Sequence, residues 1–312
     1  MGVVTFNTAA LSVKALRRLL DEDQGCKLRL LVRDNGSTDD TVERLRAEVP
    51  EADVDAGADN LGFARGVNSL IARSTAPWFF ALNSDAWPAP GAIKHLVETA
   101  EAHPRAALVV PRLERPGGEL EYSTHPFPSP KIAAATAFSV WRWRGSAAAS
   151  DMLLDGFWQH DVERDVDWAA GAAWLMRRAA IDDIGGLDER FFMYAEDMEW
   201  CWRAAKHGWT VRLDPAAVVV HVGNASGASA YGRRRTMAYL QNSYRFYRGE
   251  HGPIDTAAYR LLSLGGSARL YLRAKRRGDA PGAAHWADHV RTHLRPIPST
   301  DTSQPVAKRR SS

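Results

Sequence analysis

Acidic side chains at two places in this sequence could carry out chemistry on a polar substrate. Asp85 ends the run Leu82-Asn83-Ser84-Asp85 after an apolar segment, and Glu196 and Asp197 stand together at the start of a helical pattern. A carboxylate can hold a hard divalent cation such as Mg²⁺, or it can accept a proton as a general base. Complementation of the helix dipole is the simpler explanation for the acidic pair. It does not explain the preceding run Phe191-Phe192-Met193-Tyr194.

Other polar residues allow two interpretations each. Asp34 precedes Asn35 and Gly36 at the end of a predicted strand. It could accept hydrogen bonds from a nucleobase or a ribose, and Gly36 would allow a tight turn. The same run is also ordinary turn chemistry. Asn60 could cap the helix that follows it, and a single histidine at a strand end, as His221 is, more often has a structural role.

The first hundred residues alternate predicted strands with predicted helices. We expect strands at 3–6, 28–32, 52–55, 78–82 and 107–110, and helices at 11–19, 41–48, 63–73 and 90–102. Repeated βα units of this length are typical of a mostly parallel sheet covered by helices. Ligands of such sheets bind beyond the carboxyl ends of the strands. Asn7, Asp34 and Asp85 each follow a predicted strand, so we expect them at one edge of the sheet.

The second half is less regular. Residues 114–165 are rich in Pro, Gly and Ala without a clear period, and we interpret them as loops and short helices. A strand-like run at 166–176, helices at 179–184 and 196–206, and strands at 210–213 and 218–222 are expected next. The chain beyond 231 is predicted to be helical and basic, and beyond 296 its composition predicts disorder.

Taken in order, these motifs resemble those of family 2 glycosyltransferases with the GT-A fold, and most of all their bacterial rhamnosyltransferase-like branch. The resemblance covers residues 3 to about 230. It implies an α/β fold, in which a Rossmann-like, mostly parallel, nucleotide-binding sheet is flanked by helices, here with a C-terminal helical extension. The series comprises 5–7, 34–39, 60–68, 82–85, 185–192, 196–197 and His221.

The resemblance also implies roles for individual residues in a metal-dependent, inverting sugar transfer. Asp197 matches the catalytic base, with Glu196 positioning it or the acceptor. Asp85 and His221 match ligands of Mg²⁺ or Mn²⁺, but Asn83 replaces the first Asp of the usual Asp-x-Asp motif, so the site has one charge fewer. The residues expected at the nucleotide sugar are Thr5, Phe6, Asn7, Asp34, Asn35, Gly36, Asn60, Gly62, Arg65, Asn68, Asn83, Ser84 and Asp85.

Two more residues are expected to contact the acceptor, because they extend from the same helix as the acidic pair. Trp200 and Arg203 share a face with Glu196 by i, i+3 and i, i+4 spacing. On this basis residues 1–230 form the glycosyltransferase domain, with a nucleotide-sugar-binding half (1–112) and an acceptor and catalytic half (113–230). Residues 231–295 form the basic helical extension and 296–312 a disordered tail.

The partners implied are a dTDP- or UDP-sugar donor and a hydroxyl acceptor in cell-wall or polysaccharide biosynthesis. L-Rhamnose is the first expectation for the sugar, with galactofuranose, glucose and mannose open. The acceptor could be a saccharide, a polyprenyl-linked saccharide or a small natural product. A net charge of +3 is too small to imply nucleic acid.

We expect a cytoplasmic protein. Cys26 and Cys201 have neither metal-ligand spacing nor the number that a disulfide framework needs. No signal peptide is recognisable, and the weakly polar run at 132–141 is about half of the roughly 20 residues that span a bilayer. Apolar residues alternate with Arg and Lys at 261–277. That segment fits a peripheral contact with the inner face of the cell membrane, a helix packed on the domain, or a homodimer contact.

Two other functions compete with sugar transfer. A sugar-nucleotide pyrophosphorylase needs a Gly-rich basic loop after its first strand, and residues 5–8 supply none. A nucleotide-sugar-binding protein without catalysis is favoured by Asn83 alone. Asp85, Asp197 and His221 together argue against it.

Overall fold

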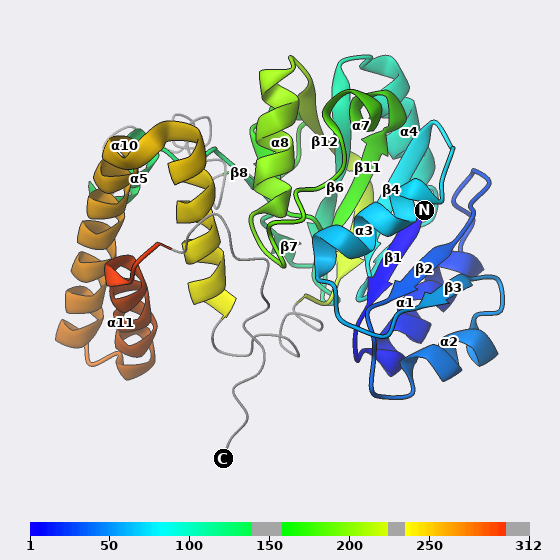
Figure 1. Cartoon of the computed structure of the whole chain (residues 1–312), viewed down its shortest axis with the longest axis horizontal. Helices are drawn as coiled ribbons and strands as arrows, with labels where there is room; N and C mark the ends of the chain where they lie inside the picture. Colours follow the sequence, from blue (N-terminus) through cyan, green and yellow to red (C-terminus); the bar gives the residue numbers. More distant parts are fainter. Residues whose placement is uncertain (139–157, 224–234, 298–312) are drawn as a thin grey trace.

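The computed structural model describes residues 1–138, 158–223 and 235–297, and a ten-stranded mixed sheet forms its centre (Figure 1). The strand order is β3-β2-β1-β4-β11-β6-β12-β5, with β7 beside β6 and β9 beside β12. The strands that share one direction are β1 (Gly2–Thr5), β2 (Leu31–Asp34), β3 (Asp53–Ala56), β4 (Trp78–Asn83), β6 (Ala106–Glu114) and β12 (Thr210–His221). The opposite direction is taken by β5 (Ala86–Pro88), β7 (Leu120–Glu121), β9 (Arg164–Val166) and β11 (Ala173–Arg177). The prediction of a mostly parallel sheet is therefore confirmed.

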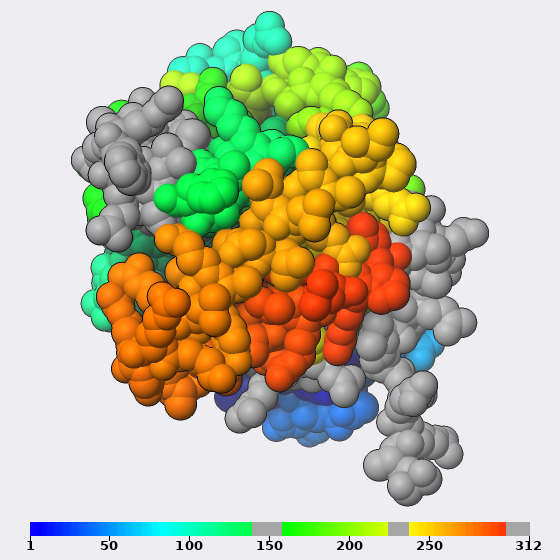
Figure 2. All heavy atoms as spheres, turned by 90° about the vertical axis from the view of Figure 1, so that its left-hand side faces the viewer, coloured from blue at the N-terminus to red at the C-terminus, as the bar shows by residue number. Residues whose placement is uncertain are grey.

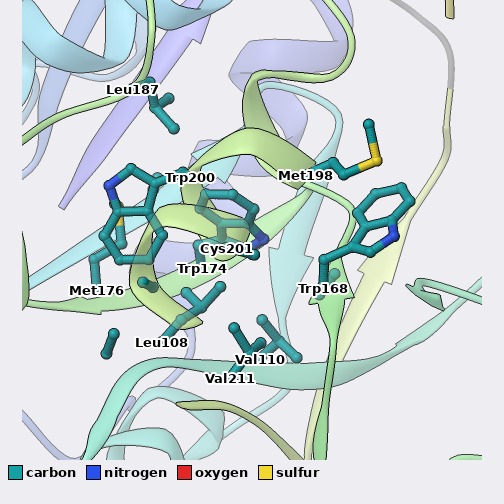
Figure 3. Close-up of a cluster of buried hydrophobic side chains, with 14 of the residues drawn as sticks. Leu108, Val110, Trp168, Trp174, Met176, Leu187, Met198, Trp200, Cys201 and Val211 are labelled. Atoms are coloured by element: carbon teal, nitrogen blue, oxygen red, sulfur yellow. The ribbon is translucent and has the colours of Figure 1, made fainter. Parts of the chain in front are cut away.

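Helices cover both faces of this sheet, because its central strands are apolar on both sides. In β4, Phe79 packs into one hydrophobic cluster and Phe80 into the other, as alternate residues of a strand must. The first cluster includes side chains of α3 (Phe63–Ala72), α7 (Arg178–Ile184) and α8 (Glu196–Lys206). Figure 3 shows Met198, Trp200 and Cys201 of α8 in this cluster. The second includes side chains of α1 (Ala9–Asp21), α2 (Thr41–Glu48) and α4 (Ala92–Ala102).

The remaining elements lie to one side of the sheet. A two-stranded sheet pairs β8 (Thr124–His125) with β10 (Trp168–Ala169). Helices α5 (Pro130–Phe138), α10 (Arg235–Arg276) and α11 (Ala280–Leu294) pack together at the left of Figure 1. Within α10 the backbone breaks at Gly252, which has a φ of 78° and is followed by Pro253, so the chain continues as two helical segments.

Most predicted elements are present, and the differences have local causes. The predicted strands at 210–213 and 218–222 form one strand, β12, with a bulge between Asp214 and Val218. Pro215 cannot donate a ladder hydrogen bond, so the strand bends there instead of ending. The run at 166–176 divides into β9, β10 and β11, and the irregular region also contains β7, β8 and α5. Parts of the predicted loops, and almost all of the predicted C-terminal tail, lie outside the described residues.

Candidate functional site

A cavity of about 480 Å³ lies at the carboxyl ends of β1 and β4 and the start of α8. Because β1, β2 and β4 are adjacent and parallel, their polar end residues meet at one edge, as predicted. The cavity wall includes Asp85 from one half of the chain and Asp197 from the other. Predicted site residues that line it are Thr5, Phe6, Asn35, Asn60, Gly62, Asn83, Ser84, Asp85, Glu196, Asp197 and His221.

At one end of the cavity, His221 lies between two carboxylates. Its Nδ1 is 2.9 Å from Oε2 of Glu121, and its Nε2 is 3.3 Å from Oδ1 of Asp85. The amide nitrogen of Asn83 is 3.4 Å from the same Nε2. Burial lowers the pKa of His221, but the hydrogen bonds to Asp85 and Glu121 outweigh it and raise the pKa to about 9.

This end of the cavity fits a divalent cation only in part. In residues 1–138, 158–223 and 235–297, no group of three or more His, Cys, Asp or Glu side chains is arranged to hold a metal ion. Asp85 and His221 offer one carboxylate oxygen and one imidazole nitrogen. Protein Mg²⁺ sites often use one or two carboxylates and complete the shell with water and substrate phosphates. The donor set is therefore that of a site which a diphosphate would complete.

The other end of the cavity is built by the first turn of α8. Asp197 accepts hydrogen bonds from the backbone N–H groups of Met198, at 2.8 Å, and Gly171, at 3.3 Å. Burial raises the pKa of Asp197, while these two N–H groups and the charge of His125 oppose the increase. Buried Glu196 has less support, and within the described part of the chain its Oε2 has no hydrogen-bond partner.

The surroundings of Glu196 and Asp197 raise their pKa values to different extents. Burial, and then the charge of Asp197, raise the pKa of Glu196 well above its ordinary value. We assign the retained proton to Glu196 and the negative charge to Asp197, because only Asp197 receives hydrogen bonds from two backbone N–H groups. Two carboxyl groups whose environments separate their pKa values are the arrangement in which one serves as base and the other stays neutral.

Helix α10 holds the loop that leads into this acidic pair. Tyr194 and Ala195 have positive φ values of 71° and 77°, a strained conformation for residues other than glycine. The side-chain amide of Asn242 donates to the carbonyl oxygens of Met193 and Tyr194, at 2.9 and 3.1 Å. Nearby on the same helix, Arg245 donates to the carbonyl oxygen of Arg190 at 3.0 Å. The C-terminal helices are thus tied to the site. No pattern in the sequence indicates this role for an Asn inside a helix.

The structure also adds residues to the cavity wall that we did not predict. Glu121, His125, Trp168 and Tyr239 line it. The rings of His125 and Trp168 are 4.6 Å apart, on the two strands of the small sheet. Glu121 and His125 come from the region without periodicity, where no spacing distinguishes a site residue from a loop residue.

Three predicted nucleotide-contacting residues form the loop behind the cavity wall instead. The buried Asp34 carboxylate accepts hydrogen bonds from the Thr5 hydroxyl and from the backbone N–H and the hydroxyl of Ser37, at 2.6–2.9 Å. Asn7 accepts from the Thr38 N–H at 2.8 Å. Gly36 has a φ of 73°, and a Cβ there would lie 2.9 Å from the Ala58 carbonyl oxygen. These are contacts within a turn, which is the alternative interpretation that the sequence allowed for the run beginning at Asp34.

Arg65 and Asn68 join α3 to the loop at 185–189 and do not line the cavity. The Asn68 side chain accepts from the N–H of Leu187 at 2.8 Å and donates to its carbonyl oxygen at 2.9 Å. Exposed Arg65 forms an ion pair with Glu189 at 3.4 Å. The motif that contains them thus fixes the loop at 185–189 against α3.

Trp200 and Arg203, which we predicted to contact the acceptor, do not line the cavity. Trp200 is fully buried against Trp174, with ring centroids 5.9 Å apart, and its Nε1 donates to the Gly185 carbonyl oxygen (Figure 3). Arg203 forms an ion pair with Glu199 at 2.6 Å and donates to backbone carbonyls of the same loop. The helix face that they occupy points into the core, because β11 and the 184–187 segment cover it.

Family models and curated relatives match this chain. The model described as glycosyl transferase family 2 matches residues 2–185, and one described as glycosyl transferase family group 2 matches residues 122–273. The N-acetylglucosaminyl-diphospho-decaprenol L-rhamnosyltransferase of Mycobacterium tuberculosis is 31% identical over 216 residues, which cover 62% of this chain and 66% of that protein. The pre-mycofactocin glycosyltransferase of the same organism is 29% identical, over 67% of this chain and 40% of its own length. The chain thus spans slightly less than two thirds of the first relative and less of the second.

Solved structures share the fold at low sequence identity. The mannosyltransferase PcManGT of Pyrobaculum calidifontis, in complex with GDP-Man and Mn²⁺, aligns with a TM-score of 0.55 at 18% identity, over 94% of this chain and 79% of that one. GalNAc-T7 with UDP, GalNAc and Mn²⁺ aligns with a TM-score of 0.58 at 13% identity, over 94% and 55%. These likenesses confirm the GT-A fold. Since the first family model covers more than half of the chain, the protein belongs to glycosyl transferase family 2.

Proposed function

We propose that this protein transfers a sugar from a nucleoside-diphosphate donor to a hydroxyl group of an acceptor, with inversion at the anomeric carbon. The observation that carries the proposal is the single cavity shared by Asp85, His221 and Asp197, three residues that the family resemblance had selected separately. An anion-contacting end and a proton-accepting end in one cavity are what a displacement of diphosphate by a hydroxyl requires.

The donor would lie with its diphosphate toward His221. The departing diphosphate gains negative charge as the bond to the sugar breaks, and positive charge at this end of the cavity stabilises it. Asp85 and His221 would hold a Mg²⁺ or Mn²⁺ ion, which supplies that positive charge when bound. The two Mn²⁺-containing neighbours of the same fold support a divalent cation, without distinguishing Mn²⁺ from Mg²⁺.

Asp197 would act as the general base. As the acceptor oxygen forms its bond to the anomeric carbon, the bond from that carbon to the diphosphate oxygen breaks on the opposite face. The hydroxyl proton passes to the Asp197 carboxylate, so charge and atoms balance. Glu196, which keeps its own proton, lies beside Asp197 in the wall of the cavity. Its neutral carboxyl group can donate a hydrogen bond to the acceptor without competing for the proton.

The relatives favour L-rhamnose as the sugar and a lipid-linked saccharide as the acceptor in cell-wall biosynthesis. The relative with 31% identity acts on a decaprenol-linked acceptor, as its name states, and a second relative is the rhamnosyltransferase WbbL of Escherichia coli, at 28% identity over 81 residues. A galactofuranosyl glycosyltransferase of Leishmania donovani, at 26% identity, keeps galactofuranose as an alternative. Trp168 and Tyr239 line the cavity, and flat aromatic rings of this kind suit the face of a sugar.

A donor screen tests the proposal. Purified protein is incubated with dTDP-rhamnose, UDP-galactofuranose, UDP-glucose or GDP-mannose and a polyprenyl-diphosphate-linked N-acetylglucosamine, and nucleotide release and product are measured. We expect one donor to be consumed, loss of turnover with EDTA, and recovery with Mg²⁺ or Mn²⁺. The anomeric configuration of the product, read by NMR, should be opposite to that of the donor. A retained configuration would contradict the assigned role of Asp197.

A nucleotide-sugar-binding protein without catalysis is the second candidate function, and Asn83 is the observation that favours it. Asn83 takes the place of a carboxylate beside His221 and lowers the negative charge available to a cation. Donor binding without EDTA sensitivity and without turnover on any acceptor would support this candidate. A small natural product as acceptor, which the pre-mycofactocin relative suggests, is tested in the same screen by adding acceptors without a lipid.

A further inference from the structure

The segment 253–297, which we call the C-terminal hairpin, exposes a row of large apolar side chains. It consists of the second part of α10, α11 and the three residues after it. Ile254 is 83% exposed, Leu261 67% and Leu272 51%. At about 100° per residue, these three side chains fall within about 20° of one another around the helix. Leu294 on α11 is 66% exposed as well.

Such exposure is concentrated on the hairpin. Six large apolar side chains among the described residues have more than half of their surface exposed. Four of the six lie on the hairpin. A fifth, Phe138, ends α5, which packs against α10. The other is Val162, in the loop before β9. Isolated exposed apolar residues need no explanation, but a cluster rimmed by polar groups marks a contact surface.

The opposite side of the hairpin is firmly packed, so the exposed row is not a sign of a loose helix. Buried His293 of α11 is 2.7 Å from the Tyr244 hydroxyl and 2.9 Å from the Ser267 hydroxyl, both on α10. Arg260 donates to the carbonyl oxygens of His293 and Arg295. The hairpin is therefore a preformed platform with its apolar row turned outward. Its outer face is the orange and red surface in Figure 2.

The same segment is strongly basic. Residues 253–297 contain eight Lys or Arg and three Asp or Glu, a formal excess of five positive charges, whereas the whole chain carries +3. Five of the basic residues lie close together in sequence, with Arg269, Arg273, Lys275 and Arg276 in the last two turns of α10 and Arg277 directly after it. Beside the apolar row is a groove of about 500 Å³, lined by Arg248, Arg260, Leu261, Leu264, Leu294 and Ile297.

We propose that the C-terminal hairpin binds the surface of a membrane that contains anionic lipids. Apolar side chains in a row with Lys and Arg beside them are the composition of a helix that lies in a membrane interface, where both burial and charge attraction contribute. A spanning role is excluded for the described residues, since none of their helices is both long and apolar enough to cross a bilayer. The contact is with the surface.

A second copy of the chain is a poorer occupant of this face. Pairing two hairpins would bring the two sets of excess positive charge together, and like charges across an interface oppose association. An anionic lipid surface instead neutralises these charges. The groove offers Arg248 and Arg260 to a lipid headgroup, and its apolar walls offer contacts to the first carbons of the acyl chains.

Vesicle co-sedimentation of the full chain tests this proposal. The vesicles are phosphatidylcholine alone, or phosphatidylcholine with about one third phosphatidylglycerol. We expect at least tenfold stronger binding to the anionic vesicles, weakened by salt. The double variant Leu261→Glu/Leu272→Glu and the double variant Arg273→Glu/Arg276→Glu should each lower that binding at least tenfold. The matched control Val162→Glu, an equally exposed apolar site off the hairpin, should bind like the parent.

The outcomes separate clearly, and none depends on the proposed enzymatic activity. All substituted side chains are exposed, and circular dichroism confirms that the variants are folded. No binding to anionic vesicles, or binding that the hairpin variants retain, would overturn the proposal. A dimer in sedimentation equilibrium that dissociates in Leu261→Glu would assign the face to a second copy instead, which also overturns it.

Discussion

The side-chain amide of Asn242 donates a hydrogen bond to the carbonyl oxygen of Tyr194, at 3.1 Å, across the junction between α10 and the loop that precedes α8. Tyr194 and Ala195 both have positive φ values. A left-handed conformation costs about 1–2 kcal/mol for each residue that carries a Cβ. The strain is held by contacts such as this one, because the backbone would otherwise relax and move the first turn of α8.

Replacing Asn242 should therefore lower turnover more than substrate binding. In Asn242→Ala we expect kcat to fall about tenfold or more, because a small displacement of Asp197 is costly for proton transfer. The KM for the donor, whose diphosphate lies at the other end of the cavity, should change little. Asn242→Asp, of similar size but unable to donate, should be at least as impaired. Steady-state kinetics on both variants, with melting temperatures as a control for folding, measure this effect. If the melting temperature falls as well, so that the loss of kcat reflects a loss of folded protein, the role of Asn242 is purely structural.

The base assignment predicts the effect of Asp197→Asn. The amide has almost the same shape but cannot accept the hydroxyl proton, so we expect turnover to fall by about 10²–10⁴ while donor affinity is retained. Single-turnover kinetics and isothermal titration with the intact donor measure the two quantities. The control is Asp182→Asn, a change of the same chemistry at an exposed position of α7 that does not line the cavity. Near-normal turnover in Asp197→Asn would refute the role of Asp197 as base.

The charge of His125 gives a pH prediction. Its proximity lowers the pKa of Asp197, in opposition to burial. Removing it in His125→Asn should raise that pKa, so the acid limb of the kcat/KM profile should move to higher pH. The pH range in which activity is lost would then extend closer to neutrality. A pH–rate profile of parent and variant measures the shift, and a limb that stays in place, or moves to lower pH, would show that His125 does not act on Asp197 through charge.

The sequence predicted the edge of the sheet better than the loops around it. The strand ends predicted at 6, 32 and 82 lie within two residues of the actual ends at Thr5, Asp34 and Asn83, because apolar runs stop there. Parallel pairing then brings such ends together. Whether a polar side chain then turns into the cavity or back into its own loop is a matter of a single rotamer and its local partners. Asp34 turns back, because Thr5 and Ser37 offer it three hydrogen bonds.

The prediction of which face of α8 is accessible to a substrate is not supported, for a related reason. The i, i+4 spacing correctly places Trp200 with Glu196, but it does not say which face is covered. The 184–187 segment and β11 cover this face, and these tertiary contacts cannot be read from the spacing of residues along the helix. Glu121 and Asn242 reach the site from segments more than a hundred residues apart. Neither lies in a local pattern that could have indicated a role, so only the folded chain reveals them.

The buried carboxyl group of Glu196 predicts how stability varies with pH. Its pKa in the folded state is raised well above the ordinary value of 4.5 by burial and by Asp197. Below about pH 4.5 the group is protonated in both states and contributes no difference. As pH rises above that value, the unfolded chain releases the proton while the folded chain retains it, so unfolding becomes easier until the folded-state pKa is passed.

Glu196→Gln removes this titration while keeping the shape of the neutral acid. We therefore expect the variant to be more stable than the parent at neutral pH, by about 2–4 °C in Tm if the relief is about 1 kcal/mol. The difference should shrink toward zero as pH falls to about 4. Thermal unfolding from pH 4 to 8 measures it, and Glu43→Gln, on the exposed side of α2, reports the effect of removing a surface carboxylate. A Gln variant that is less stable than the parent at pH 7, or a difference that is independent of pH, would show that Glu196 is ionised in the folded protein. The assignment of the proton to Glu196 and of the charge to Asp197 would then have to be reversed.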